Sequence, residues 1–159
     1  MTTTIIKAIS LHQPWATFIP MGLKKYETRS WYTSYRGPLL ICAAKKTSTS
    51  QKLTHNYLIN TYQQLLTKTN NYVEWQDLPF GCAVALVDLT ACIKMTPAFI
   101  NQQPETEIDT GDWKPGRFAW QLENIRPIVP PISVIGKQGL FDVEIALPQK
   151  LEPILATNL

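Results

Sequence analysis

The chain has few of the residues from which metal sites and disulfide frameworks are built. Its 159 residues include only three cysteines and two histidines. Cys42, Cys82 and Cys92 are isolated among apolar residues, whereas zinc sites need ligands paired at short spacing and secreted disulfide frameworks need even counts. We therefore predict three reduced, buried thiols, and a site with no metal and no cofactor.

Long apolar runs are also missing. A membrane-spanning helix needs about 20 consecutive apolar residues, and the sequence has no such run. The first residues, MTTTIIKAIS, do not follow the basic, apolar and small-residue order of a secretion signal. The composition, 45% hydrophobic and 17% charged, is that of an ordinary globular domain. We expect a cytoplasmic protein with no membrane partner.

Two common phosphate-binding signatures are absent. There is no Walker-type loop and no glycine-rich dinucleotide fingerprint after a strand. The net charge of +3 tolerates a polyanionic partner without requiring one, because the field depends on where charges cluster. Of the two histidines, His12 is expected to make a structural hydrogen bond at a strand-to-helix junction, and His55 is expected on the solvated flank of a helix.

The chain does contain a series of strand-like apolar segments. Alternating or continuous apolar residues predict strands at 5–11, 24–30, 38–44, 81–93, 118–122, 127–132 and 139–146. Two helices are predicted early in the chain, a short one from Pro14 to Gly22 and an amphipathic one within 47–69. Residues 94–116 show no periodicity and are predicted as a long connection, a kind of loop that is more often functional than idle.

These elements predict an α+β fold. We expect a small, mostly antiparallel β-barrel or curled sheet of about five to seven strands, with two helices inserted early. The expected domain covers residues 1–147, and residues 148–159 are expected to form a C-terminal tail.

The most informative stretch is GLKKYETR at residues 22–29. In a strand, alternation places Glu27 and Arg29 on one face, with Lys24 at the strand's entrance. Two interpretations stay open. Lys24 and Arg29 hold a phosphate or polarise a carbonyl while Glu27 orients Arg29 or takes a proton, or the charges form a structural ion pair.

Aromatic and basic residues interleave in and after this stretch, in KKYETRSWYTSYRG at residues 24–37. Lys45 and Lys46 extend the basic character from the end of the following predicted strand. Such mixtures grip single-stranded nucleic acids, because bases stack on the rings while cations meet phosphates.

Four segments in order carry a family resemblance: HQPWATFIPMGLKKYETRSW, RGPLLICAAK, GDWKPGRFAW and GKQGLFDV. Together they resemble the ASCH domain, a branch of the PUA-like superfamily of small β-barrels. The family's G-x-K-x-x-E-x-R element is met by Gly22, Lys24, Glu27 and Arg29, and its upstream Q-P-W by residues 13–15. The following segment, Trp31 and then Arg36-Gly37, fits the subgroup related to the domain of transcription coactivators. The resemblance runs from about residue 5 to about residue 145.

The resemblance implies a function linked to RNA. PUA-like domains commonly bind RNA, and nucleic-acid binding or ribonuclease activity is attributed to some ASCH members. Other small members are amidohydrolases that deacetylate N4-acetylcytidine with the motif lysine, a threonine three residues later and a downstream glutamate. Lys24 matches that lysine, but Glu27 stands in the threonine's place, which favours binding over that hydrolysis. Similar members keep an acid just before G-D-x-x-x-G-R, which favours Glu107 over its rivals Asp109 and Asp112.

Our first hypothesis is therefore a protein that binds RNA or a nucleotide in a cleft built on this motif. The predicted ligand-binding residues are Lys24, Arg29, Trp31, Arg117 and Gln13. The alternative is a nucleic-acid-related hydrolase, either an N4-acetylcytidine amidohydrolase or a metal-independent ribonuclease. Its predicted catalytic residues are Lys24, Glu27 and Glu107. A third hypothesis is an interaction module with protein partners in transcription or translation, which would use the exposed aromatic side chains.

Overall fold

A six-stranded sheet organises the residues that the computed structural model describes, which are 2–69 and 73–154. Its strands are β1 (Thr4–Leu11), β2 (Tyr26–Arg29), β3 (Gly37–Ala43), β4 (Cys82–Lys94), β5 (Phe118–Ser133) and β6 (Phe141–Ile145). They are hydrogen-bonded in the order β2-β5-β4-β3-β1-β6. Within the described residues, β1 and β3 pair in parallel and the other four pairings are antiparallel. The fold therefore mixes α and β structure, as predicted.

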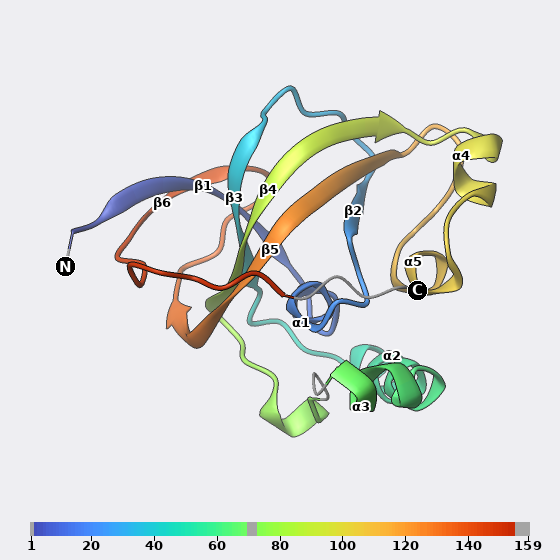
Figure 1. Cartoon of the computed structure of the whole chain (residues 1–159), viewed down its shortest axis with the longest axis horizontal. Coiled ribbons are helices and arrows are strands. Elements are labelled where there is room, and N and C mark those ends of the chain that lie inside the picture. The colour runs from blue at the N-terminus through green and yellow to red at the C-terminus, as the bar shows by residue number, and fades with distance from the viewer. Residues whose placement is uncertain (1, 70–72, 155–159) are drawn as a thin grey trace.

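The expected closed barrel is not formed. The end strands of the order are β2 and β6, and they do not pair with each other, although β4 and β5 are long and bent (Figure 1). The four-residue strand β2 pairs with β5 alone, along Tyr26–Arg29 and Phe118–Gln121. On its other side, β2 reaches β1 through a side chain, since Arg29 Nη2 donates to the Ser10 carbonyl at 3.2 Å. The sheet is curled and open at this point.

The two strands predicted at 118–122 and 127–132 are one strand, β5. The intervening residues 123–126 are mostly polar, and they form a bulge in the pairing with β4. Asn124 takes φ 50°, and its Nδ2 donates to Asp88 at 3.1 Å. Arg126 Nη2 donates to the same carboxylate at 2.7 Å. Asp88 thus holds the bulge that keeps the strand continuous.

Two helices were predicted, but the described residues form five. Those found are α1 (Trp15–Met21), α2 (Thr49–Thr61), α3 (Gln63–Thr69), α4 (Pro97–Asn101) and α5 (Glu105–Thr110), with a 3₁₀ turn η1 at Trp75–Asp77. The predicted helix within 47–69 is divided into α2 and α3. The connection 94–116 contains α4 and α5, which are too short to show a period. None of the helices in the described ranges is long and apolar enough to cross a membrane.

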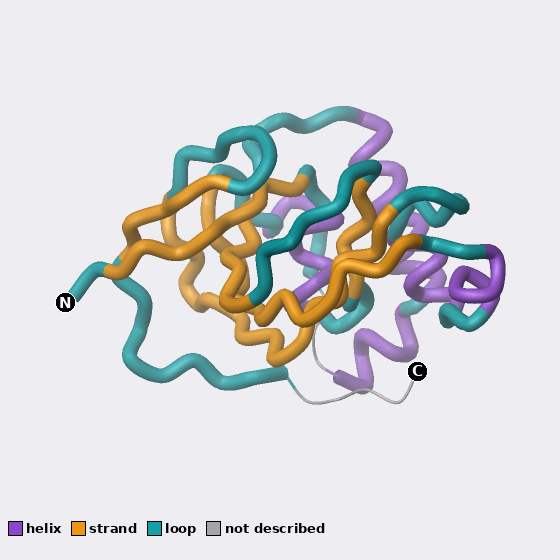
Figure 2. The backbone as a smooth tube through the Cα atoms, turned by 90° about the horizontal axis from the view of Figure 1, so that it is seen from above, coloured by secondary structure: helices purple, strands orange, loops and turns teal. Residues whose placement is uncertain are grey.

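The helices gather toward one end of the sheet (Figure 2). Helix α1 covers the sheet through residues such as Ile19, which shares the main core with Ile9, Ile41 and Trp120. On its other side, Phe18 packs with residues of α2 and α3. His55 on α2 is buried, its ring stacks on Phe18, and burial lowers its pKa. The expectation that His55 is solvated was wrong.

The three thiols are free, as predicted. Cys42 and Cys82 are also buried, as predicted, whereas Cys92 is only half-buried, so the prediction of burial was wrong for Cys92. Burial raises the pKa of Cys42 to about 12, so this thiol behaves as a small apolar side chain.

After β6, the chain continues along the sheet. Leu147 and Leu151 pack against a second apolar cluster, and the Ile154 backbone N–H donates to the Ile125 carbonyl at 2.8 Å. The division into a domain at 1–147 and a tail at 148–159 stays a prediction, and residues 155–159 lie outside the described residues.

Gly22 turns the chain from α1 into the segment that leads to β2. It caps α1 in the left-handed region, with φ 87°, and its N–H bonds the Ile19 carbonyl. The N–H groups of Leu23 and Lys24 both donate to the Phe18 carbonyl. This turn fixes where Lys24 enters the site.

We expect Gly22→Ala to lower the free energy of unfolding by about 1–2 kcal/mol, because a side chain with a Cβ is strained in the left-handed region. A Cβ there would meet only Ile154 Cδ1 at 3.7 Å, an ordinary contact, so the loss would report backbone strain. Urea denaturation measures it. Gly22→Asn should lose less, since asparagine tolerates this region. Equal stability of Gly22→Ala and wild type would contradict this account of the turn.

Candidate ligand-binding site

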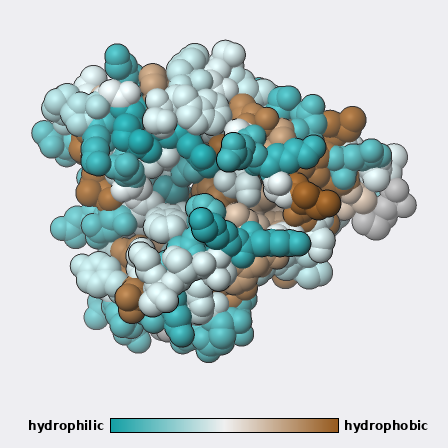
Figure 3. Space-filling model, turned by 180° about the vertical axis from the view of Figure 1, so that it is seen from behind, coloured by the Kyte–Doolittle hydropathy of each residue, from teal (hydrophilic) through white to brown (hydrophobic). Residues whose placement is uncertain are grey.

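A large open cavity lies where the sheet is not closed. Its volume is about 1150 Å³, and Figure 3 shows a hollow bordered mainly by hydrophilic residues on the rear face. The lining comes mainly from the ends of β1 and β3, from β2 and the residues after it, and from two loops before β5 and β6. These segments are 10–12, 43–46, 27–31, 109–112 and 134–139.

Glu27 lies among charged side chains that line this cavity, with Lys24 and Arg29 as its partners. We call these three residues the charged floor. Glu27 is 7% exposed. Its Oε1 accepts the Thr28 N–H at 3.0 Å, and its Oε2 accepts Arg29 Nε and lies 3.0 Å from Arg29 Nη2. Lys24 Nζ lies 3.6 Å from Oε1. A buried carboxylate is costly unless it is paired and hydrogen-bonded, and Glu27 has both kinds of partner.

Lys24 joins β2 to helix α5. Its side chain is 1% exposed, and Nζ donates to the Thr110 carbonyl at 2.8 Å. An ammonium group has three hydrogens, of which this bond uses one. Because Lys24 also lines the cavity, it adds positive charge to the floor.

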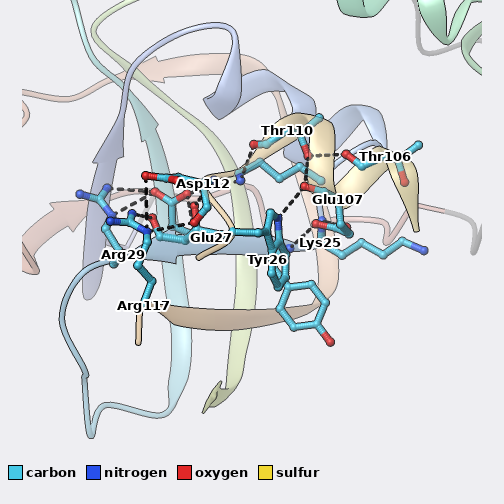
Figure 4. A network of polar contacts seen from close by, with 12 residues as sticks. Lys25, Tyr26, Glu27, Arg29, Thr106, Glu107, Thr110, Asp112 and Arg117 are labelled. Atoms are coloured by element: carbon cyan, nitrogen blue, oxygen red, sulfur yellow. Dashed lines mark hydrogen bonds and ion pairs between the residues drawn. The ribbon is translucent and has the colours of Figure 1, made fainter. Parts of the chain in front are cut away.

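Two guanidinium groups lie beside Glu27 (Figure 4). Arg117 Nε donates to the Asp112 carbonyl at 2.9 Å and lies 3.6 Å from Asp112 Oδ2. Arg29 is held by Glu27 and by the Ser10 carbonyl. Both side chains remain 26% exposed. An arginine has five N–H donors in a fixed fork, so the unused part of each fork is available to an anion in the cavity.

Trp31 supplies a partly exposed aromatic ring. It is 36% exposed and lines the cavity. The ring stands edge-to-face on buried Trp120, with centroids 4.8 Å apart and an interplanar angle of 89°. Trp120 Nε1 also donates to the Trp31 carbonyl at 3.4 Å. The ring of Trp31 is thereby held in one orientation at the cavity wall.

Glu107 is buried, but it does not line the cavity. Its Oε2 accepts the Lys25 N–H at 2.8 Å and its Oε1 accepts the Tyr26 N–H at 3.3 Å, as Figure 4 shows. Burial raises the pKa of Glu107, against the opposing effect of these bonds and of the charges of Lys24 and Lys25. The carboxyl group fastens α5 to the start of β2.

Gln13 also lies outside the lining. The residue is fully buried. Its Nε2 donates to Thr17 Oγ1 at 2.6 Å and to the Pro79 carbonyl at 2.8 Å, and its Oε1 accepts the Thr17 N–H. Its amide group is therefore occupied by contacts with α1 and with the residues before β4.

The structure thus brings together most of the predicted site residues. Those lining the cavity are Lys24, Glu27, Arg29, Trp31 and Arg117. Sequence reasoning missed Ser10, Thr110 and Lys137, which also line it. The parallel pairing of β1 and β3 places the ends of both strands at one edge of the sheet, and this long-range feature has no signal in either segment alone.

Residues 9–154 match the family model of the ASCH domain, and the chain belongs to the ASCH domain family. The family prediction is therefore confirmed. Among curated proteins, the chain is similar to activating signal cointegrator 1 of Homo sapiens, at 40% identity over 141 residues, and to that of Mus musculus, at 30% over 141 residues. These matches cover 89% of this chain and 23% of the length of each relative.

We expect Glu107→Gln to lower the free energy of unfolding by about 1–3 kcal/mol at neutral pH, because the amide NH₂ would face a backbone N–H and leave it unsatisfied. Urea denaturation measures the change. Glu105→Gln is the matched control, since Glu105 is exposed on the same helix and its loss should leave stability within about 0.5 kcal/mol of wild type. Equal stability of both variants would show that Glu107 does not fasten α5 to β2.

Proposed function

We propose that the cavity binds single-stranded RNA or a nucleotide. The observation that supports this best is the pre-arranged fork of Arg29. Glu27 and the Ser10 carbonyl fix the guanidinium, while a quarter of the side chain stays exposed toward the cavity. Because Nε and Nη2 are used in these contacts, Nη1 is the part of the guanidinium that is left to donate to a phosphate oxygen.

The charge of the lining favours an anionic ligand. Among the described residues, six lysine or arginine residues line the cavity, against three aspartate or glutamate residues. The ring of Trp31 adds a surface on which a base stacks, which is worth about 1–3 kcal/mol per base. Phosphate contacts and stacking together are the usual means of gripping a single strand.

The same geometry favours binding over hydrolysis. A lysine that acts as base or nucleophile must lose a proton, whereas Lys24 Nζ faces two acceptors, the Thr110 carbonyl and the Glu27 carboxylate. Each oxygen of Glu107 accepts a backbone N–H group, and Glu107 does not line the cavity. The relatives' name, activating signal cointegrator, supports a setting in transcription, in which RNA binding and protein partners would coexist.

We expect wild-type protein to bind labelled oligouridine with an affinity that falls steeply with salt. Trp31→Ala should weaken binding roughly 5- to 150-fold, the equivalent of stacking one base, and Trp31→Phe should retain most of it. Fluorescence anisotropy measures the affinity. Tyr57→Ala is the control, because Tyr57 is 65% exposed on α2 and does not line this cavity. Unchanged binding by Trp31→Ala and by Arg29→Ala would place the RNA elsewhere.

The hydrolase alternative is tested with N4-acetylcytidine. If the site only binds, no acetate is released at micromolar protein. Acetate release that Lys24→Ala abolishes, and that Glu105→Gln leaves intact, would contradict the proposal and establish the amidohydrolase instead.

A further inference from the structure

Some of the positive side chains that line the cavity lie beside carboxylates, and others do not. At the β2 end, Lys24, Arg29 and Arg117 each lie within 3.6 Å of a carboxylate oxygen. The lining also includes Lys45 and Lys46 from the segment after β3 and Lys137 from the loop between β5 and β6. We call these last three the lysine rim.

All three side chains of the lysine rim are exposed. No ion pair is found for any of them among residues 2–69 and 73–154. The cations at the β2 end are therefore paired with carboxylates, whereas the lysine rim carries positive charge that the described part of the protein does not neutralise.

The fold brings the lysine rim together from distant parts of the chain. A Cβ added to Gly136 would lie 2.9 Å from Ser10 Oγ, so the loop that carries Lys137 lies close against β1. A Cβ at Gly81 would lie 2.7 Å from Lys45 Cε, so the aliphatic stem of Lys45 rests on the backbone there. Ser10 is also the residue whose carbonyl holds Arg29. It thus stands between the β2 end and the lysine rim.

The size of the cavity also favours a ligand larger than one small molecule. Sites that enclose one small molecule usually measure about 300–1,000 Å³, and this cavity measures about 1150 Å³. Lysine is a flexible point charge that binds phosphate without fixed geometry. Such groups suit successive phosphates of a chain, whose positions vary, better than a single group that must be oriented.

We propose that the ligand is a single-stranded oligonucleotide rather than a mononucleotide. One nucleotide occupies the β2 end, with its base against Trp31 and its phosphate on Arg29. The phosphates of the neighbouring nucleotides lie on the lysine rim formed by Lys45, Lys46 and Lys137. This inference rests on the proposed function and narrows its ligand class.

The test compares oligouridine of about eight nucleotides, uridine monophosphate and uridine triphosphate as ligands, each titrated by calorimetry at several salt concentrations. In the variant Lys45→Ala, Lys46→Ala, Lys137→Ala, we expect the salt slope for the oligonucleotide to fall in magnitude by about 2, since each phosphate contact contributes about 0.7 for a single strand. Affinity for the monophosphate should be unchanged. The control replaces Lys68, Lys94 and Lys150 by alanine. These lysines are exposed and lie outside the cavity, and the same charge is removed, so the slope should stay at the wild-type value.

Three results would overturn the inference. One is an unchanged slope for the oligonucleotide in the lysine-rim variant. Another is a monophosphate affinity that falls as much as that of the oligonucleotide. The third is that uridine triphosphate binds as tightly as the oligonucleotide and depends equally on the lysine rim. In that case the ligand would be one nucleotide with a polyphosphate chain. Failure of the wild type to bind any of these ligands would instead contradict the proposed function itself.

Discussion

The pairing of the buried Glu27 carboxylate is the interaction on which the rest of the site depends. A charge at this depth is tolerated only because Arg29, Lys24 and a backbone N–H surround it. In return, the carboxylate fixes both cations. Arg29 then reaches the end of β1 and Lys24 reaches the end of α5. Removing either cation would leave an incompletely paired buried acid, so this cluster supports the structure and also lines the cavity.

These side-chain links replace a backbone ladder at the open side of the sheet. Strand β2 pairs only with β5, and Arg29 spans the remaining gap to β1. A ladder between β2 and β1 would close the space that now forms the cavity. The open sheet therefore leaves room for a ligand, while the charged floor and the Glu107 contacts of α5 keep the walls in place. The cations at the floor are held by ion pairs, whereas none of the ion pairs among the described residues involves the lysine rim.

Much of this site was predictable, for reasons that are local. Gly22 ends α1 because only a residue without a Cβ takes that turn easily, and strand alternation puts Glu27 and Arg29 on one face. What could not be predicted depends on pairing across long stretches of chain. The hydrogen bonds of Glu107 to the Lys25 and Tyr26 amides could not be predicted, because an acid near a motif gives no sign of which amides it meets. The parallel register of β1 and β3, which brings Lys45 beside β1, likewise has no local signature.

We propose that a single RNA strand lies in the cavity around Glu27. The most direct measurement is an NMR titration of ¹⁵N-labelled protein with short oligouridine, following each backbone amide. The account predicts the largest shifts at residues 28–31, 110–112 and 45–46, which line the cavity from three sides. Shifts confined to α2 and α3, or to the outer residues of β4 and β5 with the cavity amides unmoved, would contradict it.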